Sequence, residues 1–142
     1  MTDLVLFPDV DALARRILLD GLAERGVTSI KVGTQVPSPM PDRFIRVFSL
    51  PGREVCRRTQ WCQVIAFVYD AAGREVRCSE LAQLVAAILR AAPDAVIDGE
   101  QVPVSEPCEQ RGPYWSQDPD LPNHPRMQIN LTWTLQSTVS AG

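Results

Sequence analysis

RFIRVFSLPGREVCRRTQWCQVIAFVYD, at residues 43–70, is the stretch around which we expect this chain to fold. Its first arm, residues 43–50, is rich in the β-branched and aromatic side chains that favour strands. Pro51 and Gly52 suit the two central positions of a type II turn, so we expect the chain to reverse there. The returning arm ends at residues 64–69, which are apolar on both faces, as is typical of a strand inside a sheet. The stretch therefore predicts a β-hairpin at the centre of a sheet.

Two amphipathic helices are predicted, one before and one after this hairpin. The first covers residues 9–25, where apolar residues recur at helical spacing. Asp9 is a suitable N-cap, and Gly26 suits the left-handed position after the last turn. The second helix begins at Asp70 or Ser79, directly after the hairpin. Its apolar face is formed by Cys78, Leu81, Leu84, Val85, Ile88, Leu89 and Ala92.

The remaining strands follow from shorter patterns. Residues 30–36 alternate as a strand does, and residues 96–104 predict an irregular or edge strand pair. Residues 127–136 alternate strictly between apolar and polar, which predicts a strand with one wet face, and the tail after Ser137 is expected to be loose. The order α-β-β-β-α-β-β predicts an α+β fold, with a mixed, mostly antiparallel sheet and two helices packed on one face.

Length, composition and charge exclude several classes of protein. The 142 residues suit one domain spanning 1–142, and 45% apolar with 22% charged residues is ordinary globular composition. The net charge of −3 provides no global positive field for nucleic acid or an anionic membrane. No apolar run approaches the ~20 residues that a membrane span needs. The N-terminus lacks the features of a signal peptide, so we expect the chain to stay in a cytoplasm with reduced thiols.

The cysteines and the histidine lack the spacing that metal binding or nucleophilic catalysis needs. A zinc site would draw on Cys56, Cys62, Cys78, Cys108 and His124, but no C-x-x-C or H-x-x-x-H pair is present. Cys78 falls on an apolar helix face, where a thiol acts as a small hydrophobe. His124 stands between prolines in a surface loop, which does not favour a Cys–His nucleophile. Common catalytic and nucleotide-binding motifs are missing, so we expect no enzyme, catalytic residue, metal or cofactor.

One basic cluster, residues 53–61, includes an aromatic side chain. Arg57 and Arg58 stand beside Trp61 there, a combination that can meet phosphates and stack on bases. The alternative is a solvated hairpin arm or a protein contact, which the acidic chain favours.

A proline-rich arm is expected at residues 106–125, because five prolines among polar residues make a long loop that is typical of interaction segments. Arg111, Tyr114 and Trp115 are of the residue types that dominate protein interfaces. Alternatively the arm folds back and Trp115 fills its own core. The predicted partner or oligomer contacts are Arg57, Arg58, Trp61, Arg111, Tyr114 and Trp115.

Four segments, taken in order, resemble a known family. They are FPDV at residues 7–10, RFIRV at 43–47 after a proline-rich loop, the apolar strand ending at 69–70 before a Leu- and Ala-rich helix, and PRMQINL at 125–131. Their order and spacing resemble the tail terminator proteins of long-tailed, siphovirus-type bacteriophages, especially those infecting actinobacteria. The resemblance covers most of the chain, although the four cysteines depart from the family's pattern.

The resemblance implies a small α+β protein that forms a homohexameric ring on the finished tail tube, stops its growth and offers a face to the head-completion (stopper) protein. It implies a virion protein at the neck end of the tail, assembled in the host cytoplasm, with no membrane and no sequence-specific nucleic acid. DNA would have room to pass through the ring. We expect ring contacts from the proline-rich arm or from strand 127–136, the latter by pairing with a neighbour's sheet.

Three alternatives remain open. The first is a head-completion or other neck protein. The second is a small nucleic-acid-binding module that uses Arg53, Arg57, Arg58 and Trp61. The third is a zinc protein or a cysteine-dependent enzyme.

Overall fold

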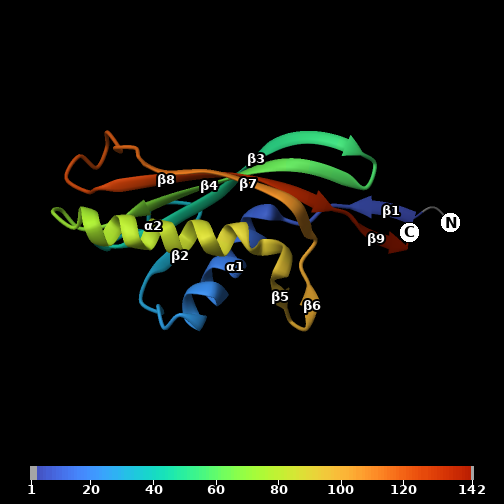
Figure 1. Ribbon diagram of the computed structural model, residues 1–142, viewed down its shortest axis with the longest axis horizontal. Helices are drawn as coiled ribbons and strands as arrows, with labels where there is room; N and C mark the ends of the chain where they lie inside the picture. The colour runs from blue at the N-terminus through green and yellow to red at the C-terminus, as the bar shows by residue number, and fades with distance from the viewer. Residues whose placement is uncertain (1–2, 142) are drawn as a thin grey trace.

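The computed structural model describes the backbone of residues 3–141 and the side chains of residues 6–137. A five-stranded sheet in the order β2-β3-β4-β8-β7 covers two helices, α1 (Val10–Glu24) and α2 (Glu75–Arg90), which pack on one face (Figure 1). The sheet strands are β2 (Lys31–Gly33), β3 (Phe44–Cys56), β4 (Thr59–Tyr69), β7 (Val104–Trp115) and β8 (Arg126–Gln136). The β2–β3 pair is parallel and the other pairs are antiparallel. The predicted α+β fold and its element order are confirmed.

The β3–β4 hairpin is longer than predicted. The chain reverses at Arg57 and Arg58, so the turn expected at Pro51 and Gly52 is wrong. Gly52 has a different role: a Cβ there would stand 2.0 Å from the carbonyl oxygen of Trp61. The register also shifts after Pro51, which is typical of a β-bulge. Gly52 therefore permits a close approach of the two strands, and the hairpin continues beyond it.

The first helix forms as predicted and is tied to the hairpin. The Asp9 side chain caps it by accepting from the Ala12 N–H at 3.3 Å, and Gly26 follows it with φ +76°. Within the first turn, Asp11 accepts hydrogen bonds from the backbone N–H and the hydroxyl of Ser49, at 2.6 and 2.7 Å. These bonds fix α1 against the middle of β3.

The second helix begins between the two predicted starts, five residues after Asp70 and four before Ser79. It starts at Glu75, and its N-cap residue Arg74 makes no side-chain capping hydrogen bond. Asp70 is fully buried and accepts from the guanidinium of Arg77, with Arg43 at 3.2 Å. Burial acts to raise the pKa of Asp70, but hydrogen bonds from Arg77 and the Ala71 N–H outweigh it, so the net pKa is lowered. The charge network joins β3, β4 and α2 at one end of the sheet.

Two short strand pairs complete the chain. β5 (Val96–Ile97) and β6 (Glu100–Gln101) form a small hairpin after the 3₁₀ turn η1 (Ala92–Asp94), inside the range where an irregular strand pair was expected. β1 (Asp3–Leu6) pairs with β9 (Thr138–Ala141), so the expectation of a loose tail is wrong.

The strand β8 is confirmed, with alternate side chains in the core. Its largest side chain, Trp133, is fully buried and donates its indole N–H to the Leu89 carbonyl of α2 at 3.1 Å. However, β8 lies between β4 and β7, and both of its edges are paired. It therefore has no free edge to pair with a neighbouring subunit, and that expectation is wrong.

Half of the proline-rich segment is strand. Its first part, residues 106–115, belongs to β7, so the expected loop shortens to residues 116–125. β7 is an edge strand, and Pro107 and Pro113 lie within the two register shifts of its pairing with β8. Proline and bulges at an edge hinder pairing with another chain.

Candidate interaction surfaces

One face of the sheet has no helix over it. Along β4 the residues Cys62, Val64, Ala66 and Val68 point into the core, so the residues between them point to the other side. The strand registers place matching residues of β3, β7 and β8 on that side. We name this surface the open face, and its residues are Arg46, Phe48, Gln63, Ile65, Phe67, Glu109, Arg111, Tyr114, Arg126, Gln128, Asn130 and Thr132.

Arginines stack on aromatic rings across the open face. The guanidinium carbon of Arg46 lies 4.9 Å from the Phe48 ring centroid and 5.9 Å from that of Phe67. Arg126 approaches Phe67 from the other neighbouring strand, at 4.1 Å. Such pairs contribute about 0.5–1 kcal/mol each at exposed sites. The result is an ordered surface of half-exposed rings and fixed positive charges, the composition that protein interfaces use.

One end of the open face is covered by the loop at residues 116–125. Tyr69 donates its hydroxyl hydrogen to the Asp118 carboxylate at 2.9 Å, and Arg126 lies 3.6 Å from the same group. Burial acts to raise the pKa of Asp118, but hydrogen bonds from the Asp120 N–H and Tyr69, with the charge of Arg126, lower it overall. The loop is therefore anchored to the sheet and is no free tether.

The predicted contact residues of β7 lie on both sides of the sheet. Arg111 and Tyr114 are exposed on the open face, where the Tyr114 hydroxyl accepts from the Asn130 amide at 2.9 Å. Trp115 points to the other side, beside Glu75 at the start of α2. It is 53% exposed, so the alternative in which Trp115 fills the core is wrong.

The other predicted contact residues lie at the end of the hairpin. We name residues 50–58 the hairpin tip, and all of them are exposed. Arg57 and Arg58 form its turn, and Trp61 follows on the open-face side of β4 with the Arg53 guanidinium 5.1 Å above its ring. Figure 1 shows the hairpin curving away from the helices.

The two groups of predicted residues are well separated. Trp61 pairs with Thr134 of β8, whereas Tyr114 pairs with Gln128. Six residues along a strand correspond to about 20 Å. The predicted contact residues therefore belong to two separate surfaces, one at the hairpin tip and one on β7. The sequence analysis did not predict the stacking of Arg46 on aromatic rings. An arginine among the apolar residues of a predicted strand was the available signal.

The cysteines offer little reactive chemistry. All four are free, and burial raises the pKa of Cys62, Cys78 and Cys108 to about 11, so these thiols stay protonated. Cys56 is exposed on the hairpin tip, and its pKa is lowered by hydrogen bonds, first from the Arg58 backbone and then from Thr59. Within the described residues, no group of three His, Cys, Asp or Glu side chains is arranged to hold a metal ion.

Neither protein-family models nor a search of curated proteins gave a match for this chain. In the part of the chain that the structure describes, no helix has the length and apolar character to cross a membrane.

Proposed function

We propose that this chain is a virion structural protein, the tail terminator of a long-tailed bacteriophage. It forms a homohexameric ring that caps the tail tube, ends its polymerisation and provides the joining surface for the head-completion protein. The identity of the family comes from the resemblance of four ordered sequence segments. The surfaces of the chain support a role in assembly, as the hairpin tip illustrates best.

The composition of the hairpin tip is the main support for the proposal. It exposes Leu50 and Val55, at 41% and 46%, beside the basic side chains of the turn. Apolar residues at the end of a projecting hairpin contribute nothing to this chain's own core. Exposed apolar groups flanked by arginine are typical of surfaces that another protein covers. We therefore assign the hairpin tip to a contact with another subunit or tail protein.

A ring protein at the end of a tube must contact several partners at once. Each subunit meets two neighbours, the tube below and the stopper above. The hairpin tip, the open face around Phe67 and the surface around Trp115 are separate parts of this chain. Separate surfaces allow these contacts to be made at the same time.

The direct experiment mixes the purified protein with polymerising tail-tube protein from the same genome and images the products by negative-stain microscopy. We expect tubes of limited length with ring-shaped density at one end. Tubes of uncontrolled length with bare ends would contradict the proposal. Binding to a head-side connector in the absence of tube binding would instead support the neck-protein alternative.

The nucleic-acid alternative makes a different prediction. Arginine contacts to phosphates release counterions, so DNA binding would fall by several orders of magnitude between about 50 and 200 mM salt. The ring of Trp61 is already contacted by Arg53, which leaves it less available to stack on a base. We expect filter binding to detect no salt-dependent binding of DNA.

A further inference from the structure

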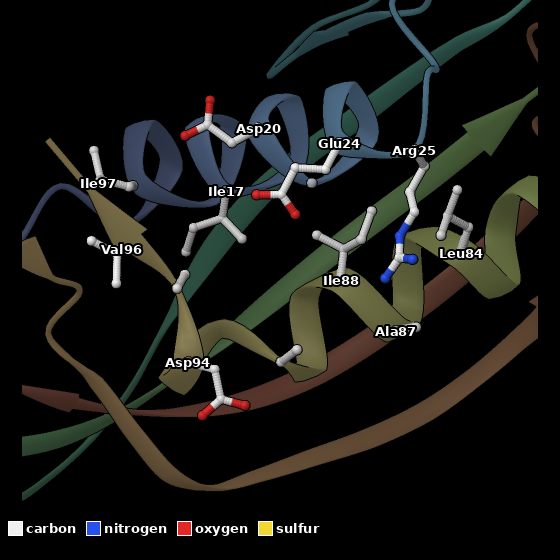
Figure 2. A pocket seen from close by; sticks show the side chains of 13 residues that line it. Ile17, Asp20, Glu24, Arg25, Leu84, Ala87, Ile88, Asp94, Val96 and Ile97 are labelled. Carbon is white, nitrogen blue, oxygen red and sulfur yellow. The ribbon is translucent and has the colours of Figure 1, made fainter. Parts of the chain in front are cut away.

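A groove lies between the two helices on the side away from the sheet. Side chains of α1, α2 and β5 line it, as Figure 2 shows. Its volume is about 460 Å³. Its floor is apolar, with Ile17, Leu84 and Ile88 among the lining residues. The floor includes Gly21, where a Cβ would stand 2.6 Å from the Ile88 side chain, so this close packing of the two helices would have to shift. Val96 of β5 extends the apolar lining and is 62% exposed.

The rim of the groove is acidic. Asp20, Glu24 and Asp94 surround it, against the single guanidinium of Arg25. Asp20 is paired with Arg16 at 3.1 Å. Among the described residues, Glu24 and Asp94 have no ion-pair partner. The groove therefore presents an apolar floor beside two carboxylates that form no ion pair, and the Arg25 guanidinium is the one cation on the rim.

The hairpin tip has the complementary composition. It presents the half-exposed Val55 two residues from Arg53 and two from Arg57, Arg58 follows in the turn, and Glu54 is the one acidic residue of the tip. Among the described residues, these three arginines form no ion pair. A tip with three arginines, one carboxylate and an exposed apolar residue complements an apolar floor with a mainly acidic rim.

The tip cannot fill the groove of its own chain. In Figure 1 the β3–β4 hairpin curves away on one side of the molecule, whereas β5 lies on the opposite side beyond the helices. A second copy of the chain supplies the complementary surface without any strand pairing, which suits a sheet with hindered edges. Because the two surfaces differ, the contact is head-to-tail, and repeated contacts of this kind close into a ring or continue as a filament.

We propose that the hairpin tip of one subunit seats in the groove between α1 and α2 of the next subunit. Val55 contacts the apolar floor, and the arginines of the tip pair with Glu24 and Asp94 on the rim. The inference rests on the proposed ring, because it names the contact that joins its subunits.

Cross-linking through a native thiol tests this contact. Cys56 is exposed on the tip, beside Val55, and Val96 is exposed on the groove. The Val96→Cys variant is oxidised both alone and on tail tubes, and the products are separated without reductant. We expect intermolecular disulfides in a ladder that ends at a closed oligomer, with about tenfold more product than the control. Replacing Cys56 by alanine should remove the ladder.

Val76→Cys is the matched control. Val76 is 74% exposed on α2, outside the groove, so the same substitution tests random collision. Circular dichroism and melting curves confirm that both variants fold. Equal cross-linking of the two variants, or none for Val96→Cys on capped tubes, would overturn the inference.

Charge reversal tests the polar part of the contact. Arg57→Glu with Arg58→Glu should abolish the Val96→Cys ladder, since it places carboxylates against the acidic rim. Adding Glu24→Arg and Asp94→Arg to the same chain should restore it. Failure to restore the ladder in a folded protein would contradict the assigned ion pairs.

These results are distinguishable from failure of the proposed function. Capped tubes without a tip-to-groove cross-link would leave the terminator proposal standing and overturn the inference. A cross-linked ladder with uncapped tubes would do the reverse. A ladder that is replaced by a cross-link to the tube protein would assign the groove to another partner and overturn the inference.

Discussion

The inner and outer halves of the β3–β4 hairpin have opposite surroundings. The inner half is buried through Phe44, Ile45, Val47, Val64, Ala66 and Val68. In the outer half, every residue from 50 to 58 is exposed. The apolar composition of the inner half is explained by its contribution to the stability of this chain, because its side chains fill the core. The outer half contributes little to that stability, and its composition is instead that of a contact surface.

The largest effect is expected from the inner half. Phe44→Ala removes a fully buried ring that stacks on Tyr69 at 4.2 Å between centroids. We expect the free energy of unfolding to fall by about 3–5 kcal/mol, measured by urea denaturation. Trp61→Ala in the outer half should cost about 1 kcal/mol or less. Equal losses would contradict the contrast between the halves.

The charge network at the base of the hairpin comes second. Asp70→Asn removes a buried carboxylate that faces Arg43 and Arg77, and it should cost about 2–3 kcal/mol at neutral pH. This expected loss of stability is moderate because the side chains of both arginines are partly exposed to water. Urea denaturation of the two proteins at pH 7 measures the difference.

The ion pairs of Asp70 also make the free energy of unfolding depend on pH in one direction. The pKa of Asp70 is lowered in the folded protein from its ordinary value of 3.8. Its contribution is therefore complete above that value and is lost as the pH falls through the lower, folded-state pKa. The stability difference between the wild type and Asp70→Asn should shrink as the pH is lowered below about 4. A difference that grows on acidification would contradict the pairing.

A smaller effect is expected where the two halves of the hairpin meet. Gly52→Ala places a Cβ against the Trp61 carbonyl, so the strands must shift, at a cost of about 1–2 kcal/mol. Because the shift moves the hairpin tip, cross-linking from Cys56 to the groove should also decrease. Gly33→Ala is the control, since its Cβ would meet nothing closer than 3.9 Å. Melting curves and cross-linking yields report the two effects separately.

The smallest effect on stability is expected at the turn. Arg57→Glu with Arg58→Glu should change the free energy of unfolding by about 0.5 kcal/mol or less, because both side chains are exposed. The same variant should lose the contact with its neighbour. A large loss of stability would show that the turn belongs to the folded core, and it would contradict the contrast between the inner and outer halves of the hairpin.

The elements that the sequence predicted are those defined by their own periodicity. The alternation at residues 126–136 and the Asp9 cap are local patterns, and both were found. The expected turn at Pro51 failed because Gly52 serves an approach to Trp61 on the opposite strand. The helix start expected at Asp70 was wrong because Arg43, at the beginning of the hairpin, and Arg77 of α2 hold that carboxylate.

The features of the candidate surfaces also divide into those that follow from a local sequence pattern and those that depend on distant segments. Exposure of Arg57, Arg58 and Trp61 followed from a basic cluster within one segment. The position of β8 between β4 and β7 does not follow from its own alternation, because partners are chosen by the whole sheet. The groove required Gly21 of one helix to pack on Ile88 of the other, a contact between distant segments. Such features depend on tertiary packing and not on local pattern.

We propose that the hairpin tip serves the assembly of a ring that ends the tail tube. The most direct test measures the lengths and ends of tail tubes polymerised with the wild type or with Arg57→Glu and Arg58→Glu, by negative-stain microscopy. We predict short tubes with a ring at one end for the wild type, and long tubes with bare ends for the folded variant. Bare ends with the wild type, or equal capping by both proteins, would contradict the account.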